Sequence, residues 1–424
     1  MKIARRLGLW AVVLSSMLPA AVAVQAEDFA KPQQVTPVVL FPAFHFTTLK
    51  VTVEGQTVAP ECPASGTFED FFPNDHPSAA FNQICRDKLL TLAYDADPSL
   101  PMQERFSNQP GVKVRIKDFG KTASAPFYET MYQFLEAHGY KRDKSLRVAG
   151  YDARLTPDMD GFLQRTIDLI EKTYKDNGDR PVHLVAHSNG PLYAQYLLTH
   201  VSQAWKDKYI HGFSPIAGNW PGQGSLYSAL FTGLNIIDFL PPQDPANAAS
   251  SARMYLSHPS SYMSAADPAI FGNREVVVQT LGNGRSYTPR DNAQLFRDAG
   301  LGIAQDLGAY YIGFVKFADP ASFPNVDVYA EKGSGIPSLV GAVLQDLSVG
   351  QVLDVSDASK LILADGDVNQ EAITNDSIQV WQGMACHRFE LVDNPGVDHF
   401  SLPGDPGVLG RLLQNIQRPR TVCP

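Results

Sequence analysis

Short apolar runs alternate with longer amphipathic stretches along much of the chain. Runs of this length, bounded by turn residues, are typical of buried β-strands, and the longer stretches are typical of helices. Strands that alternate with helices predict an α/β fold, with a mostly parallel central sheet and helices on both faces. The runs predicted as strands are Thr36–Phe41, Leu146–Ala149, Val182–Val185, Phe213–Ala217, Asp327–Ala330, Lys360–Ala364 and Phe389–Val392.

The helix with the clearest start signals follows the second of these runs. Thr156 is predicted as its N-cap, with Pro157 in the first turn and Asp158 and Asp160 near the positive end of the helix dipole. Its apolar face is predicted to carry Leu163, Ile167, Ile170 and Tyr174. Further helices are expected at Leu192–Val201 and Val408–Ile416.

Residues 218 to about 302 break this regular pattern. The segment is rich in Gly, Pro, Ser, Asn and Ala and carries scattered apolar islands. A long excursion at this point predicts a lid or cap, with a variable surface loop as the alternative. Residues 27–424 could form two ordinary domains, but no Gly/Pro-rich linker divides them. We therefore expect a single domain with insertions.

The first 26 residues have the composition of an export signal. Lys2, Arg5 and Arg6 precede an apolar core from Leu7 to Val24, and Val24-Gln25-Ala26 has small residues at the two positions expected of a cleavage site. A cleaved secretory signal peptide is the prediction, and an uncleaved membrane anchor is the alternative. The mature protein is therefore expected to be secreted, or to lie in a periplasmic or lysosome-like compartment.

The net charge of the chain limits the classes of binding partner that we expect. The formal net charge falls from −9 to −12 when the three cations of the signal are removed. Such an acidic chain is not expected to bind nucleic acid or to be attracted strongly to anionic membranes. Neutral or zwitterionic substrates fit better, and nothing in the sequence indicates an obligate protein partner.

Four cysteines in an exported chain predict two disulfides, for which three pairings are possible. Their order along the chain favours Cys62 with Cys85 and Cys386 with Cys423. The sequence holds no CxxC pair, so no metal site is expected.

The pentapeptide Ala186-His187-Ser188-Asn189-Gly190 lies between a predicted strand and a predicted helix. It resembles a nucleophile elbow, in which serine occupies a sharp strand-to-helix turn with small residues two positions before and after it. Ala186 takes the place of the usual first glycine. We predict Ser188 as the nucleophile of an α/β-hydrolase fold, with a serine in a tight turn and no catalytic role as the alternative.

A serine hydroxyl is a weak nucleophile at neutral pH, so it needs a histidine base and a carboxylate that supports the base. In this fold the carboxylate follows the serine along the chain, and the histidine follows the carboxylate. His399 lies in a glycine-bearing loop between the last strand and the last helix, and is predicted as the base. His387, beside a cysteine, is interpreted as structural. Asp365 and Asp367 both follow the run Lys360–Ala364, and both are candidates for the acid.

The oxyanion hole of such a site requires two backbone N–H donors. One is expected from Asn189, directly after the nucleophile. The other is expected from Phe44 or His45, in the loop after the first strand. The His45 ring is a less favoured candidate for a second base. This chemistry requires no cofactor.

Several separated sequence motifs, called phrases below, resemble those of the lecithin:cholesterol acyltransferase and lysosomal phospholipase A2 family. In that family the second aspartate of an Asp-Gly-Asp phrase is catalytic, and Trp-Gln-Gly follows at a fixed distance. Trp381 lies 14 residues after Asp367, so the resemblance implies Asp367 as the acid and leaves Asp365 as the alternative. The matching phrases are Val38–Leu49, Phe119–Thr122, Tyr151–Leu155, Val182–Gln223, Val328–Tyr329 and Gly333–Pro337.

The resemblance implies a secreted serine acyl hydrolase or acyltransferase that acts on ester-linked lipids at a membrane or lipoprotein-like surface. The Cys62 to Cys85 segment, with Phe71-Phe72, resembles the family's disulfide-closed membrane-contact loop, and the lid near Phe239-Leu240 is also expected to meet lipid. A carboxylesterase or neutral-lipid lipase is the alternative. A catalytically inactive lipid-binding protein is a more distant one.

The chain also departs from the family pattern. Ala43 and Ala153 stand where the family has glycine and tryptophan. Because these positions surround the acyl and headgroup pockets, the resemblance implies the substrate less directly than the triad.

Overall fold

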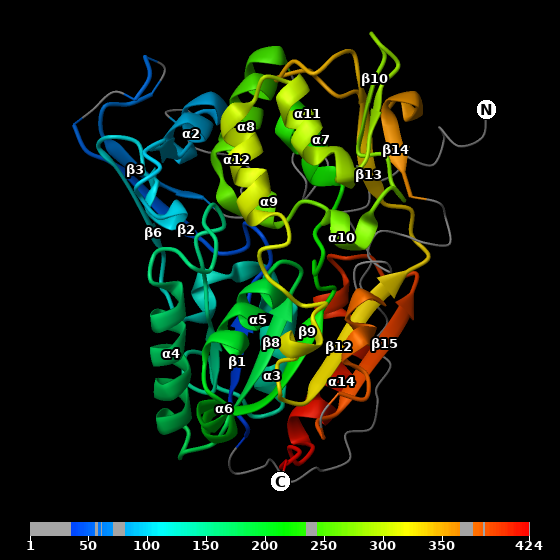
Figure 1. Cartoon of the computed structure of the whole chain (residues 1–424). Helices are drawn as coiled ribbons and strands as arrows, with labels where there is room; N and C mark the ends of the chain where they lie inside the picture. The colour runs from blue at the N-terminus through cyan, green and yellow to red at the C-terminus, as the bar shows by residue number, and fades with distance from the viewer. Residues whose placement is uncertain are drawn as a thin grey trace, which may run out of the picture.

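A computed structural model describes the chain over residues 35–55, 58–60, 62–70, 81–234, 244–364, 376–384 and 386–423. Figure 1 shows a large sheet flanked by helices, and above it a second group of helices with a small sheet. Within the described residues, no helix has the length and apolar character needed to cross a bilayer. The predicted signal, residues 1–26, lies outside them.

The large sheet is parallel throughout its described strands, in the order β15-β12-β9-β8-β1-β7. Every residue of β1 and β8 is buried, because elements cover both faces of the sheet. The predicted α/β class and mostly parallel sheet are confirmed. The strands are β1 (Val38–Phe41), β7 (Leu146–Val148), β8 (Val182–His187), β9 (Ile210–Ile216), β12 (Val328–Ser334) and β15 (Phe389–Pro395).

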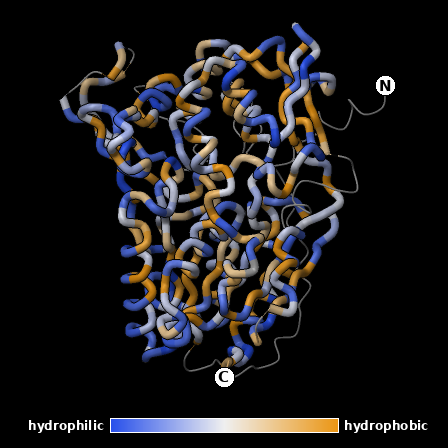
Figure 2. Tube along the Cα trace, viewed as in Figure 1, coloured by the Kyte–Doolittle hydropathy of each residue, from blue (hydrophilic) through white to orange (hydrophobic). Residues whose placement is uncertain are grey.

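The helices beside this sheet fall into two contacting groups. In one, α3 (Glu129–Ala137) contacts α14 (Pro406–Gln417); in the other, α4 (Phe162–Asp176) contacts α5 (Gly190–His200) and α6 (Gln203–Tyr209). Figure 2 shows hydrophilic and hydrophobic residues alternating along α4, as expected of a helix with one face on the body of the protein. Helices α5 and α14 agree with their predicted ranges to within two residues at each end.

The predicted start of α4 is wrong. The helix begins at Phe162, and Gly161 before it has a φ of 62°, a left-handed conformation that interrupts any helix from further upstream. The Thr156 hydroxyl donates to Asp158 (2.6 Å) within a turn instead of capping a helix. Of the predicted apolar face, Ile170 is fully buried, and Leu163, Ile167 and Tyr174 are partly buried and pack against the core. The buried residues of α4 are Phe162, Thr166, Leu169, Ile170 and Thr173.

The segment predicted as a lid, residues 218–302, is largely helical where it is described. Its residues 235–243 lie outside the described part. In Figure 1 its helices stand above the large sheet, beside α2 (Gln83–Leu90), which contacts α8. Helix α12 (Gly302–Tyr311) follows and contacts α9 and α11. Its role as a lid stays a prediction, and residues 218–302 are called the lid segment below only by position. The helices of this segment are α7 (Ser225–Thr232), α8 (Pro245–Ser257), α9 (Pro259–Met263), α10 (Pro268–Phe271) and α11 (Asn292–Asp298).

The run Lys360–Ala364 forms a strand, β14 (Leu361–Leu363), but this strand does not belong to the large sheet. It pairs antiparallel with β13 (Leu339–Leu344) in a smaller sheet of order β11-β10-β13-β14. Strands β10 (Val278–Thr280) and β11 (Ser286–Tyr287) complete it. The expectation of one sheet was wrong here because an apolar run predicts a strand without indicating its partner.

An antiparallel sheet of order β3-β2-β6 lies beside α2 and carries the first disulfide segment. Its strands are β2 (Leu49–Val53), β3 (Gly66–Asp70) and β6 (Val112–Ile116). Cys62, before β3, is bonded to Cys85 on α2, with Cα atoms 5.1 Å apart. Residues 71–80, which include Phe71 and Phe72, lie outside the described part.

The second disulfide, Cys386–Cys423, joins the C-terminal tail to the residues before β15. Both disulfides have the pairing that chain order predicted. The Thr421 N–H also donates to Asp327 (2.8 Å), and Arg388 donates to the Pro419 carbonyl (2.7 Å). Since Asp327 directly precedes β12, these contacts hold the tail at the amino end of the parallel strands.

Candidate active site

Ser188 lies on a sharp turn between β8 and α5. Its φ is 60°, a left-handed conformation that a residue with a side chain adopts only where its surroundings enforce it. The Ser188 N–H donates to the Ile216 carbonyl (3.0 Å), and the Ser188 carbonyl accepts from the Asn219 N–H (2.7 Å). The end of β9 therefore holds the serine at the carboxyl edge of the sheet in the strained turn of a nucleophile elbow.

His399 reaches the same edge from the loop after β15. Its Nε2 lies 2.8 Å from Ser188 Oγ. Asp398 shapes this loop by accepting from the N–H groups of Phe400 (2.9 Å) and Ser401 (3.0 Å). The structure thus brings the predicted nucleophile and the predicted base together, at a distance over which a base can take a hydroxyl proton.

The two candidate acids, Asp365 and Asp367, lie outside the described residues. They lie two and four residues after the end of β14 in sequence. The Trp381 of the matched motif is fully buried and donates from Nε1 to the Phe317 carbonyl (2.8 Å). The choice of Asp367 over Asp365 stays a prediction.

The loop after β1 is held by its own backbone and by a tyrosine. The Ala43 N–H donates to Tyr128 Oη (2.8 Å), and the Ala43 carbonyl accepts from the Phe46 N–H (3.1 Å). Among the described residues, the N–H groups of Phe44 and His45 have no hydrogen-bond acceptor. These N–H groups are therefore available to a ligand, as expected of oxyanion donors.

Asn189, the other predicted donor, is buried and held by its side chain. Its Oδ1 accepts from Asn219 Nδ2 (3.2 Å) and from Ser264 Oγ (3.0 Å), and Ser264 directly follows the lid helix α9. Within the described part of the chain, the Asn189 N–H also lacks an acceptor. The side-chain contacts fix this residue while leaving its N–H available at the start of α5.

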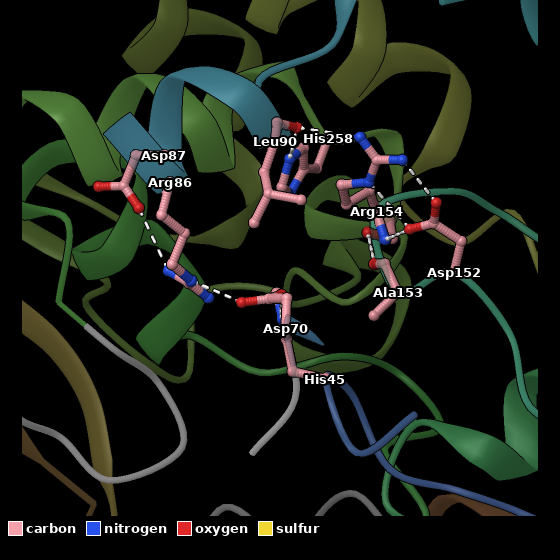
Figure 3. A network of polar contacts seen from close by, with 10 residues as sticks. His45, Asp70, Arg86, Asp87, Leu90, Asp152, Ala153, Arg154 and His258 are labelled. Atoms are coloured by element: carbon pink, nitrogen blue, oxygen red, sulfur yellow. Dashed lines mark hydrogen bonds and ion pairs between the residues drawn. The ribbon is translucent and has the colours of Figure 1, made fainter. Parts of the chain in front are cut away.

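The His45 ring is buried and points toward a carboxylate. Its Nδ1 lies 3.9 Å from Asp70 Oδ2, and Figure 3 shows the two side chains next to each other. Burial lowers the pKa of His45 to about 4, against the smaller opposing effect of Asp70, so the ring is neutral at neutral pH. This environment favours the backbone N–H of His45, and not its ring, as the functional group.

An ion network continues from Asp70 toward the lid (Figure 3). Arg86 on α2 donates to Asp70 at the end of β3 (2.5 Å) and to Asp87 (3.2 Å). Ser251 on the lid helix α8 donates to the other oxygen of Asp87 (2.6 Å). Burial raises the pKa of Asp87 to about 6, while Arg86 and Ser251 oppose that shift. The network links the disulfide segment to the lid.

A second buried ion pair lies in the matched phrase Tyr151–Leu155. Arg154 donates from Nε and Nη2 to the two oxygens of Asp152 (3.0 and 2.6 Å). Burial would raise the pKa of Asp152, but Arg154 holds it below its ordinary value. Arg154 also donates to the Leu90 carbonyl (3.2 Å), which accepts from His258 Nε2 as well (3.0 Å). The loop that carries Arg154, helix α2 and the lid segment, through His258, therefore meet at Leu90.

Sequence reasoning missed both networks. Asp70, Arg86 and Ser251 come from three separated segments, so no local spacing indicates that they meet. The Asp152–Arg154 pair did carry a signal, because opposite charges two residues apart stood inside a family phrase.

One group of three candidate metal ligands occurs in the described residues: Cys386, His387 and Cys423. Its two sulfurs are joined in the second disulfide. His387 Nε2 lies 3.2 Å from Cys423 Sγ, and Nδ1 lies 3.7 Å from Asp327 Oδ1. His387 therefore lies with the tail at the amino end of the sheet, in agreement with its interpretation as structural.

The parallel sheet and the strand-turn-helix at its carboxyl edge define an α/β-hydrolase fold. A chain in the crystal structure of the Tle4-Tli4 complex shares this fold. The match has a TM-score of 0.53 at 14% sequence identity, and covers 90% of this chain and 98% of that chain.

Sequence comparison finds more specific similarities. The family model of lecithin:cholesterol acyltransferase matches residues 80–245. The lysosomal phospholipase A and acyltransferase of Mus musculus is 29% identical over 327 residues, which are 73% of this chain and 74% of the relative. The phosphatidylcholine-sterol acyltransferase of Gallus gallus is 27% identical over 308 residues, 70% of this chain and 71% of the relative.

These matches confirm the resemblance that the separated phrases indicated: the chain is related to the lecithin:cholesterol acyltransferase family. They also confirm the predicted class of enzyme, an acyltransferase or lipid ester hydrolase.

Proposed function

We propose that the chain is an exported serine acyl hydrolase or acyltransferase that acts on ester-linked lipids. The observation that carries this proposal is the 2.8 Å contact between His399 Nε2 and Ser188 Oγ on a strained strand-to-helix turn. The names of the relatives, phospholipase A and sterol acyltransferase, support the substrate class. The pattern of residues 1–26 and the two disulfides support export.

In this mechanism His399 takes the proton of Ser188 as Oγ bonds to the acyl carbonyl carbon. The N–H groups of Asn189 and of Phe44 or His45 hold the resulting oxyanion. The intermediate expels the alcohol part of the lipid, which leaves with the proton from His399, and Ser188 retains the acyl group as an ester. Asp367, with Asp365 as the alternative, orients the imidazole and stabilises its cationic form.

The second half of the reaction releases the acyl group. Water or an acceptor alcohol gives a proton to His399 as its oxygen attacks the carbonyl carbon of the serine ester. The acyl group then leaves Ser188 as a fatty acid, if water attacked, or as a new ester, if an alcohol attacked. The serine recovers its proton from His399, so no cofactor is consumed. Access of water to the ester therefore decides between hydrolysis and transfer.

In this proposal the Cys62 to Cys85 segment and the lid segment contact the lipid surface. Phe71-Phe72 and Phe239-Leu240, the aromatic and apolar positions predicted to contact it, lie outside the described residues. The acidic net charge of the chain fits a neutral or zwitterionic headgroup better than an anionic one.

Labelling with a fluorophosphonate tests the nucleophile. Folded wild-type protein should be labelled and Ser188→Ala should not, and an unlabelled, natively folded wild type would overturn the enzyme proposal. A separate sample of the enzyme, not treated with the fluorophosphonate, is incubated with phosphatidylcholine vesicles, with and without a sterol or a primary alcohol. Free fatty acid and acylated acceptor are quantified together. Labelling without either product would favour a carboxylesterase or neutral-lipid lipase, to be tested with short-chain esters and triacylglycerol.

A further inference from the structure

Two buried polar side chains lie behind the nucleophile, and the chemistry above does not use them. His187 is the last residue of β8, and Tyr128 directly precedes α3; they are 0% and 2% exposed. Tyr128 Oη lies 3.0 Å from His187 Nδ1, and His187 Nε2 lies 2.9 Å from the His399 carbonyl oxygen. The rings of Phe46 and Phe127 pack around His187 and exclude water from it.

The acceptors set the direction of every hydrogen bond in this chain of contacts. A carbonyl oxygen only accepts, so His187 Nε2 carries the proton and donates to His399. Burial holds the pKa of His187 well below its ordinary value, so the ring is neutral and Nδ1 is an acceptor. Burial also raises the pKa of Tyr128, so its hydroxyl keeps its proton and donates to Nδ1. Tyr128 Oη in turn accepts from the Ala43 N–H (2.8 Å).

The contacts connect the two loops between which the substrate would react. At one end lies Ala43, directly before the candidate oxyanion donors Phe44 and His45. At the other end lies the backbone of His399, whose ring contacts Ser188 Oγ. Because the Ala43 N–H is hydrogen-bonded to Tyr128, it is the N–H groups of the next residues, Phe44 and His45, that remain available to an oxyanion.

We infer that Tyr128 and His187 are positioning residues that hold the oxyanion loop and the His399 loop at a fixed separation across Ser188. This inference rests on the proposed function, because it assigns the two loops their roles. It does not make either residue a catalytic group, since neither touches Ser188 Oγ in the described contacts.

Tyr128→Phe tests the inference by removing only the hydroxyl. Since small misplacement of reacting groups can cost about 100-fold in rate, we expect kcat and kcat/KM to fall by about 10- to 100-fold with KM little changed. Fluorophosphonate labelling should slow in parallel. The matched control is Tyr132→Phe, which removes an equally buried hydroxyl that donates to the Ala125 carbonyl in the same segment (2.9 Å) and reaches neither loop.

Thermal unfolding separates positioning from general loss of structure. Both variants should lose similar stability, and only Tyr128→Phe should lose rate. Equal rates in Tyr128→Phe and Tyr132→Phe would overturn the inference. If Tyr128→Phe does not fold, His187→Gln supplies the second variant, because it removes the acceptor for Tyr128 while keeping an N–H donor toward His399.

A measurement independent of catalysis keeps this inference distinct from the proposed function. In ¹⁵N-histidine NMR of the wild type, the ring signals absent from His187→Gln should report a neutral ring protonated at Nε2 from pH 8 to pH 5. A ring protonated at Nδ1, or one that becomes cationic in this range, would overturn the inference even in an active enzyme. Conversely, a wild type that shows this tautomer but is never labelled would overturn the proposed function alone.

Discussion

Gly190 lies so close to Phe41 that a Cβ atom on residue 190 would be 2.3 Å from the Phe41 carbonyl oxygen. The same Cβ would be 2.8 Å from the Pro42 carbonyl oxygen. These contacts explain why the second position after Ser188 must be glycine: α5 begins directly against the end of β1, which is followed by the proposed oxyanion loop.

Gly190→Ala should therefore destabilise the protein by about 3 kcal/mol or prevent folding, because backbone atoms must move apart to admit the methyl group. Chemical denaturation measures the change. Gly410→Ala on α14 is the control, since nothing lies within 4 Å of its added Cβ. It should stabilise the protein by about 0.5–1 kcal/mol through helix propensity. Equal stability of Gly190→Ala and the wild type would contradict the close approach.

Asp367→Asn should lower kcat by about 10⁴-fold, because an imidazole without its carboxylate loses both orientation and support for its charge. Asp365→Asn should lower kcat by less than about tenfold if that residue only forms the turn. Turnover of a soluble ester by both variants, compared with Ser188→Ala, makes the distinction. The reverse ranking would assign the acid to Asp365.

Glu275 gives the protein a stability that depends on pH. It is 8% exposed, and neither carboxylate oxygen has a hydrogen-bond partner among the described residues. Burial raises the pKa of Glu275 from 4.5 to about 7. The folded state thus holds this proton more tightly than the unfolded chain, and stability falls as pH rises from about 4.5 to about 7. Glu275→Gln should add up to about 3 kcal/mol at pH 8 and little at pH 4.

Glu331→Gln is the control for that experiment. Glu331 is also buried, but it accepts two hydrogen bonds from Arg411 (2.7 and 2.8 Å). Removing its charge should destabilise the protein at pH 8, because a paired carboxylate is lost. The free energies of unfolding of both variants, measured at pH 4 and pH 8, test whether the Glu275 carboxylate is unpaired. A loss of stability in Glu275→Gln at pH 8 would show that this carboxylate is paired.

His258 has the opposite dependence on pH. Burial, together with Arg154, lowers the pKa of His258 from 6.5 to about 3. The unfolded chain therefore takes up the proton first, and stability present above pH 6.5 is lost as pH falls toward 3. In His258→Gln, the decline in unfolding free energy between pH 6 and pH 4 should be shallower by about 1.4 kcal/mol per pH unit. Identical slopes would contradict a neutral His258 in the folded state.

Local patterns predicted the parts of the molecule that are locally determined. Strand β8, the turn at Ser188 and helix α5 are contiguous, so apolar periodicity and small residues were enough to place them. His399 was predicted as the base from its place between a strand and the last helix, and the structure brings it to Ser188.

Features that depend on distant partners could not be predicted this way. Strand β14 was expected in the large sheet, but its partner β13 is chosen by tertiary packing. The start of α4 was misplaced because Thr156 bonds to Asp158 and Gly161 turns left-handed, which its cap-like sequence does not reveal. Tyr128 gave no signal, since its partners His187 and Ala43 are 59 and 85 residues away in sequence.

The tail contacts at Asp327 and Cys423 have a practical consequence. They hold the last residues at the amino end of the parallel strands, and Figure 1 places the C-terminus at the bottom of the molecule, below the large sheet. Ser188 lies at the carboxyl edge of that sheet. An affinity handle or surface tether added after residue 424 would therefore orient immobilised protein with its reactive edge facing a vesicle suspension.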